Sequence, residues 1–270
     1  MANPNQNPNL VSLQDFLQKA PRTVPQVLIT DFSTRNTRNT LGLYSSSNIT
    51  EVTYFSEFTY QRVRARFGAL LDNTRILNVP FTSRPIEGVT TETTIAARIT
   101  EHFKPQVQWA LLHGFRHLEQ SNKKPKLTVV HYSEGPMAAI INKYTPDLAY
   151  FNPLEHPRRR PNRLPGDVKP SYKWNLNMID DGNEHVQKEF KQVLSQVNYY
   201  MKQHHTRYGF VITDQELVAI KRLNRDGELQ VSDSISWTDR GTPDQPCMTV
   251  LLALWYLGML AADERGWRLN

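Results

Sequence analysis

The sequence predicts a layered α/β protein, of the α+β kind, in which helices flank a mixed central sheet. Apolar residues recur at helical spacing over 91–120 and 183–205, whereas the segments that follow each are short, apolar and rich in β-branched residues. The uncharged apolar segment 248–262 is typical of a buried helix. This order of helix, strands, helix, strands and helix is typical of an α/β or α+β layer architecture.

The composition narrows the class of protein further. The 270 residues are 39% hydrophobic, which suffices for a sizeable core and excludes a wholly disordered chain. The net charge of +6 permits a polyanionic partner without requiring one. Cys247 is the only cysteine, so the chain forms no internal disulfide and no Cys-based zinc site, and we expect an intracellular location, in the nucleus or cytoplasm. The segment 248–262 falls short of the ~20 residues that span a membrane, so we expect no membrane association.

The first 90 residues give the weakest signals. Residues 1–25 are rich in Asn, Pro and Gln, and we expect a loose arm there. Two segments, 27–32 and 51–60, look strand-like, and 59–71 has the pattern of a short basic helix. We therefore interpret residues 1–90 as an arm and extension of unclear role, attached to a core over 91–270.

The elements of that core follow in order. A helix over 91–103 is followed by Pro105, which suits the first turn of a second helix over 105–120. A long helix over 183–205 is predicted by apolar residues that step by three and four positions. We expect strands over 127–133, 138–142, 147–151, 166–169, 208–213, 216–223 and 228–237.

Charged residues stand on two of these strands, 147–151 and 166–169. Asp147 begins the first, and Asp167 and Lys169 lie on the second. Because side chains alternate along a strand, Asp167 and Lys169 point to one side and Val168 packs into the core. If the two strands pair as a hairpin, the carboxylates of Asp147 and Asp167 converge, which favours a hard cation such as Mg²⁺ between them.

Pro146-Asp147 followed by Asp167-Val168-Lys169 resembles the motif of the PD-(D/E)XK superfamily, the restriction-endonuclease-like nucleases. The resemblance covers roughly residues 91–237 and is similar in style to nuclease-like domains of uncharacterised fungal proteins. It implies a restriction-endonuclease-like core, with a mixed central sheet between helices.

A second motif lies on the helix that follows. Gln196 and Tyr200 resemble the QxxxY motif of the RecB-like branch, and helical spacing places both on one face. The resemblance implies a Mg²⁺- or Mn²⁺-dependent nuclease, acting on DNA in preference to RNA. Lys169 would position the attacking water, while Gln196 and Tyr200 would orient the lysine or a phosphate. The implied metal ligands are Asp147, Asp167 and the carbonyl oxygen of Val168.

Members of this superfamily often add an acidic ligand from the helix before the first core strand. The candidates here are Glu92, Glu101 and Glu119. Glu119 lies at the end of the helical segment that joins the first core strand, whereas Asp147 is expected at the opposite end of the sheet. Glu101 lies farther back along the helix and therefore fits best. The loop before residue 166 would hold the nucleic-acid backbone, unless it is only a solvated basic loop. Its arginines are Arg158, Arg159, Arg160 and Arg163.

The alternative function is a nuclease-like fold used as a non-catalytic module that binds nucleic acid or protein. Taken singly, Asp147 could be a turn residue, and Asp167 with Lys169 an exposed ion pair on an edge strand. The oligomeric state, a homo-oligomer included, stays open. On the nuclease hypothesis we expect Lys169→Ala to change the free energy of unfolding by no more than ~1 kcal/mol, because its ammonium would lie at the edge of a cleft. The pair His204-His205 is expected to cap carbonyl groups at a helix end.

Overall fold

The computed structural model describes residues 9–28, 42–81, 87–121, 127–223 and 225–269. Its main sheet has eight strands, in the order β2-β9-β8-β7-β6-β5-β4, with β10 paired to β8. The pairs β2–β9 and β6–β7 are parallel and the others antiparallel, so the predicted mixed sheet is confirmed. The strands are β2 (Glu51–Tyr54), β4 (His131–Glu134), β5 (Leu148–Phe151), β6 (Gly166–Val168), β7 (Tyr208–Ile212), β8 (Glu216–Arg222), β9 (Glu228–Val231) and β10 (Ile235–Ser236).

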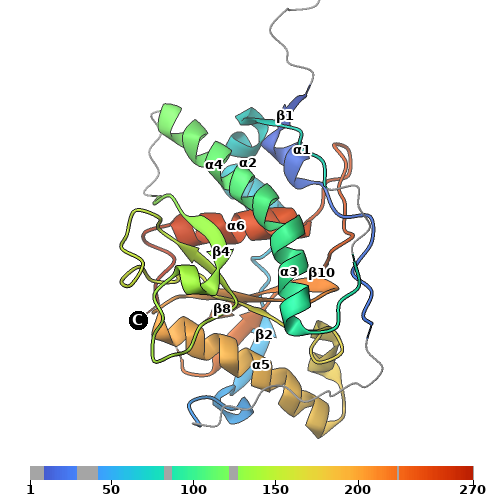
Figure 1. Ribbon diagram of the computed structural model, residues 1–270, viewed down its shortest axis with the longest axis vertical. Helices are drawn as coiled ribbons and strands as arrows, with labels where there is room; N and C mark the ends of the chain where they lie inside the picture. The colour runs from blue at the N-terminus through green and yellow to red at the C-terminus, as the bar shows by residue number, and fades with distance from the viewer. Residues whose placement is uncertain (1–8, 29–41, 82–86, 122–126, 224, 270) are drawn as a thin grey trace, which may run out of the picture.

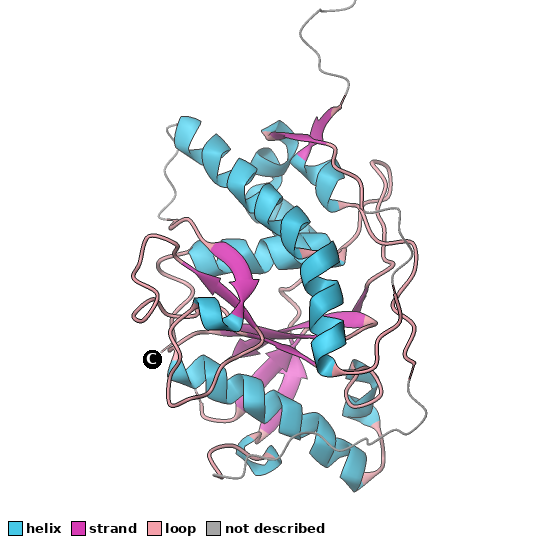
Figure 2. Ribbon diagram, in the orientation of Figure 1, coloured by secondary structure: helices cyan, strands magenta, loops and turns pink. Residues whose placement is uncertain are grey.

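Helices cover both faces of this sheet (Figures 1 and 2). Helix α5 covers one face, where Val211 and Val218 of the hairpin β7–β8 pack against it. The neighbouring residues Phe210 and Leu217 point to the other face and join the larger core, because side chains alternate along a strand. The helices are α1 (Leu13–Leu17), α2 (Tyr60–Asn73), α3 (Glu92–His102), α4 (Lys104–Gln120), α5 (Glu184–Gln203) and α6 (Val250–Ala262).

Helix α6 is the centre of the larger core. All of its residues are buried, as the apolar run in the sequence predicts. The hydroxyl of Tyr150 on β5 donates a hydrogen bond of 2.6 Å to the Leu254 carbonyl, which ties the helix to the sheet. In the part of the chain that the structure describes, no helix is both long and apolar enough to cross a membrane.

The prediction of a loose N-terminal arm is wrong for residues 10–20. Leu13, Phe16 and Leu17 of α1 are fully buried in the larger core, and β1 (Leu10–Ser12) pairs with β3 (Arg75–Leu77). The predicted strand 51–60 supplies β2 at the edge of the main sheet, and the basic helix is α2. The described part of the first 90 residues thus belongs to the same packed body. Positions 29–32 of the predicted strand 27–32 lie outside the described residues.

The predicted strand over 138–142 is also wrong. Asn142 and Lys143 have φ angles of 52° and 65°, which turn the chain back so that Ile141 bridges Tyr144. The preceding 3₁₀ helix, Gly135–Met137, ends with the Ala138 N–H bonded to the Gly135 carbonyl. Apolar composition alone could not distinguish this turn from a strand.

Candidate active site

The strands β5 and β6 form the antiparallel pair on which the two carboxylates depend. Leu148 lies opposite Gly166, so Asp147 and Asp167 follow at the adjacent position of each strand. The Oδ2 atom of Asp147 accepts a hydrogen bond of 2.8 Å from the Val168 N–H. Gly166 is required here, because a Cβ atom would lie 2.2 Å from the ring of Phe210. The register therefore brings Asp147 to the end of the strand that carries Asp167.

Asp167 and Lys169 lie side by side at this end of β6. The Lys169 Nζ atom is 2.6 Å from Asp167 Oδ2 and 3.2 Å from the Val168 carbonyl oxygen. The Lys169 N–H continues the parallel pairing with β7 by donating to the Ile212 carbonyl at 3.1 Å. Val168 packs into the larger core, opposite to Asp167. Both charged side chains are buried, so this is an interior ion pair and not an exposed pair on an edge strand.

Helix α5 adds two polar side chains to the pair. Gln196 Nε2 donates to Asp167 Oδ1 at 3.3 Å and to the Tyr200 hydroxyl oxygen at 3.0 Å. The four-residue spacing stacks Gln196 and Tyr200 on one helix face, and the packing of α5 against β7 points that face at the end of β6. The structure thus joins Asp147, Asp167, Lys169, Gln196 and Tyr200 in one site.

The helix carboxylate of this site is Glu92 and not Glu101. Glu92 is the first residue of α3, and its Oε1 atom lies 3.6 Å from Lys169 Nζ. Glu101 follows nine residues later, about 13 Å along the helix axis, and pairs with Arg98 at 2.9 Å. Glu119 lies near the far end of α4. The expectation for Glu101 is wrong because the N-terminal end of α3 meets the sheet at this point, whereas Glu101 lies at the C-terminal end of the helix.

Burial and charge set the protonation of the ion pair. Burial raises the pKa of Asp167 to about 7; Lys169 opposes this shift, and the charges of Asp147 and Glu92 add to it. Burial by itself lowers the pKa of Lys169, but Asp167, Glu92 and Asp147 together outweigh it and hold the pKa above its ordinary value. Lys169 is therefore an ammonium ion held by three carboxylates, one of them at direct contact.

Two further residues of the site were not anticipated from the sequence. Tyr44 is buried beside Tyr199, with ring centroids 5.5 Å apart, and burial and the Asp167 charge raise its pKa to about 12. Asp214 accepts hydrogen bonds of 2.7 Å from both the backbone N–H and the hydroxyl of Ser171, which fixes the chain just after Lys169. Asp214 has the sequence signature of an ordinary turn residue, and no pattern marks Tyr44.

The arginine-rich loop divides into two kinds of residue. Arg160 is buried, with its guanidinium 4.1 Å from the Phe151 ring centroid and a hydrogen bond to the Met137 carbonyl. Arg163 is buried as well and pairs with Glu264 at 2.6 Å. The expectation that these two hold nucleic acid is wrong, because their charges are used inside the fold. Arg158 and Arg159 are exposed.

The oxygen atoms of the site suit a hard divalent cation in kind. Lys169 Nζ contacts oxygens of Asp167, Val168 and Glu92, and Asp147 follows on the neighbouring strand. Carboxylate and carbonyl oxygens are the ligands that Mg²⁺ and Mn²⁺ prefer. The ammonium group of Lys169 therefore lies among the oxygen atoms that would coordinate a metal cation. Among the described residues, no group of three or more His, Cys, Asp or Glu side chains is arranged to hold a metal ion.

Comparisons with known proteins add no relative. No protein-family model matches the sequence, and neither the curated proteins nor the solved structures gave a match.

Proposed function

We propose that this protein is a metal-dependent nuclease that hydrolyses phosphodiester bonds of nucleic acid, DNA in preference to RNA. The observation that carries the proposal is the convergence of Asp147, Asp167 and Lys169 at the end of β6. The two carboxylates come from antiparallel neighbours, and the lysine is 2.6 Å from one of them. These are the residues by which the sequence resembles the PD-(D/E)XK superfamily, and their convergence supports the proposal.

Each residue of the set has a chemical role in this proposal. Asp147, Asp167, Glu92 and the Val168 carbonyl oxygen would hold Mg²⁺ or Mn²⁺, which supplies an activated water and neutralises phosphate charge. Lys169 would orient the attacking water and stabilise the negative charge that develops on the phosphate. Gln196 already donates to Asp167 and would keep that carboxylate in place.

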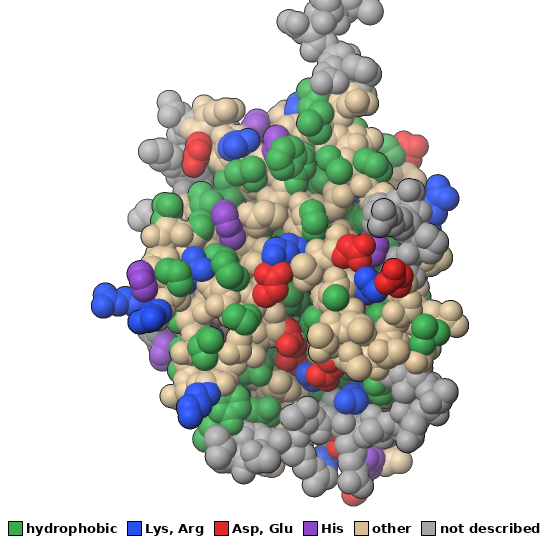
Figure 3. Space-filling view, viewed as in Figure 1, with side chains coloured by type: hydrophobic (Ala, Val, Ile, Leu, Met, Phe, Trp, Pro, Cys, Tyr) green, Lys and Arg blue, Asp and Glu red, His purple; other side chains and the backbone are tan. Residues whose placement is uncertain are grey.

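The nucleic acid would be held by exposed cations outside the carboxylate site. Figure 3 shows acidic and basic side chains interspersed on the face viewed, without a continuous basic surface. We therefore expect a few phosphate contacts and not a broad electrostatic footprint, with Arg158 and Arg159 as the candidates from the loop. Such an interface predicts a shallow dependence of binding on salt concentration.

The direct test is cleavage of plasmid, single-stranded DNA and RNA with Mg²⁺ or Mn²⁺ by matched pairs of variants. Asp147→Asn should abolish cleavage, whereas Asp244→Asn, which alters the second Pro-Asp dipeptide of the chain at an exposed position, should not. Lys169→Met should abolish cleavage, whereas Lys191→Met, in the acid-x-Lys triplet on α5, should not. Equal activities within either pair, or no cleavage by the wild type, would refute the proposal.

The second candidate, a non-catalytic binding module, is favoured by one observation. The buried ammonium of Lys169 already neutralises Asp167, so the site is stable without a metal. A ligand that binds only the folded state must raise the thermal midpoint. A melt with Mn²⁺ that is unchanged relative to the metal-free protein, together with DNA binding in EDTA, would favour this second function.

A further inference from the structure

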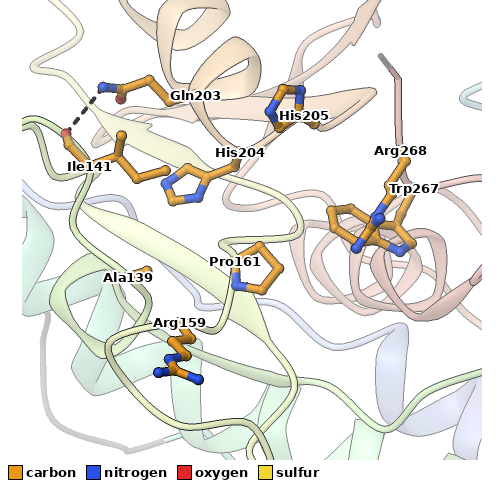
Figure 4. A pocket seen from close by; sticks show the side chains of 9 residues that line it. All are labelled: Ala139, Ile141, Arg159, Pro161, Gln203, His204, His205, Trp267 and Arg268. Atoms are coloured by element: carbon orange, nitrogen blue, oxygen red, sulfur yellow. Dashed lines mark hydrogen bonds between the residues drawn. The ribbon is translucent and has the colours of Figure 1, made fainter.

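A pocket of about 480 Å³ lies at the C-terminal end of α5, away from the candidate active site (Figure 4). Its walls come from four segments: the turn that holds Ala139 and Ile141, the arginine-rich loop, the end of α5, and the C-terminal chain. The C-terminal chain is fixed by a bridge between Thr206 and Arg268 and by a hydrogen bond from the Leu269 N–H to the His205 carbonyl. His204 lies eight residues after Gln196, about 12 Å along the helix axis.

The polar lining of this pocket consists of two arginines, two histidines and Gln203, whose Nε2 atom donates to the Ile141 carbonyl and whose Oε1 atom has no partner. The side chains of Arg159, His205 and Arg268 are exposed at the pocket, and none of the described lining residues is acidic. The Arg268 guanidinium lies 4.7 Å from the ring centroid of Trp267, which holds it over the pocket wall.

Two buried donors at the pocket have no partner. His204 is 3% exposed, and its Nδ1 atom accepts a hydrogen bond of 3.2 Å from the Asn162 N–H. Nε2 of the neutral ring therefore carries the proton, and this N–H has no hydrogen-bond acceptor in the structure. The indole N–H of Trp267, which is 1% exposed, also lacks an acceptor. Buried donors without a partner cost free energy. The indole N–H groups of all five tryptophans of the chain lack an acceptor, so Trp267 alone does not mark a binding site.

The acceptor groups of Glu264 and of the helix end near the pocket are already engaged. Glu264 pairs with Arg163 at 2.6 Å, and its carboxylate also interacts electrostatically with Arg268 of the pocket. The end of a helix would place carbonyl oxygens here, but those of Tyr200, Met201 and Lys202 accept the N–H groups of residues 204, 206 and 205. Among the described lining residues the pocket therefore offers mainly donors and positive charge, with Gln203 Oε1 as an unpartnered acceptor.

We propose that this pocket binds a phosphate group, carried either by a mononucleotide or by the end of a nucleic-acid strand. A phosphate has enough acceptor oxygens to meet donors from three directions, and arginine matches its geometry. The volume is in the range of small-ligand sites and exceeds what free phosphate needs. The proposal does not depend on nuclease activity, since it involves neither the carboxylates of β5 and β6 nor a metal.

The test compares two double variants of equal charge. Arg159→Ala with Arg268→Ala removes the two pocket arginines, whereas Arg225→Ala with Arg265→Ala removes two exposed arginines that do not line the pocket. Binding is measured in EDTA by calorimetry with inorganic phosphate and with adenosine 5′-monophosphate. It is measured by fluorescence anisotropy with a short single-stranded DNA, with and without a 5′-phosphate. Thermal melts confirm that both double variants are folded.

We expect the pocket variant to bind at least one phosphate probe about tenfold more weakly than wild type, and the control variant to change by less than about twofold. A loss confined to the 5′-phosphorylated strand assigns the pocket to a strand end, and a loss shared with the mononucleotide assigns it to nucleotides. Equal losses in both double variants, or no binding of any probe below about 10 mM, would overturn the proposal.

Discussion

Lys169 and Asp167 form an ion pair in which Nζ and Oδ2 are 2.6 Å apart and both residues are at most 2% exposed. The sequence suggested a lysine at the edge of a cleft, with little effect on stability. Removal of one partner from a buried pair leaves the other charge uncompensated, which costs several times more than removal of an exposed charge. The pair therefore stabilises the fold as well as forming the centre of the candidate site.

For Lys169→Met we expect the free energy of unfolding to fall by about 3 kcal/mol, because Asp167 remains buried without its cation. Nuclease activity, if present, should fall ~100- to 10,000-fold, the range for loss of a positioned charge-stabilising or acid–base group. Chemical denaturation and a single-turnover cleavage assay measure the two effects.

The control is the double variant Lys169→Met with Asp167→Asn. Without the carboxylate charge, most of the lost stability should return while the activity stays low. A double variant as unstable as the two single losses combined would show that the pair is not coupled, contrary to the geometry.

Glu92→Gln should raise the Mn²⁺ concentration required for half-maximal activity by about tenfold, because it removes one carboxylate beside Lys169. Glu101→Gln is the matched control on the same helix and should leave the metal requirement unchanged, since its side chain pairs with Arg98. Metal titrations of both variants decide between the two carboxylates, and a larger effect of Glu101→Gln would contradict the structure.

Tyr200→Phe should lower the free energy of unfolding by about 1 kcal/mol, because Gln196 loses its 3.0 Å acceptor while its bond to Asp167 remains. The rate should fall less than in Lys169→Met. Tyr199→Phe on the neighbouring helix position keeps its ring contact with Tyr44 and should change neither quantity by a comparable amount.

Acidification should destabilise the protein through His204. Burial, with a smaller effect of the His205 charge, lowers the pKa of His204 to about 4. The unfolded state, with the ordinary pKa near 6.5, binds the proton first, so stability is lost as the pH falls from about 6.5 to about 4. The loss should reach about 3 kcal/mol at the acid end of this range.

His204→Asn isolates this effect from the other histidines whose pKa values are lowered by burial. The amide oxygen can accept the Asn162 N–H without titrating, so the variant should lose less stability between the two pH values than wild type. Denaturation curves at pH 7 and pH 4.5 make the comparison, and parallel losses in both proteins would contradict the assignment to His204.

The long-range order of the core was readable from the sequence, because periodicity reports which face of each element is buried. The apolar positions of 183–205 and 248–262 predicted α5 and α6. The two-residue spacing of Asp167 and Lys169 predicted that both side chains lie on the same face of their strand. Where the period was absent, the predictions failed: residues 138–142 form a turn with left-handed residues, and α1 is too short to show a pattern.

Tertiary structure alone decided which groups surround the candidate site and how deeply they are buried. The packing of distant segments brings Glu92 beside Lys169 and places Tyr44 within electrostatic range of Asp167. Arg160 and Arg163 point inward, where Phe151 and Glu264 are their partners. A sequence lists charges but not their neighbours, and the protonation and energy of a charged side chain depend on its neighbours and its exposure to water.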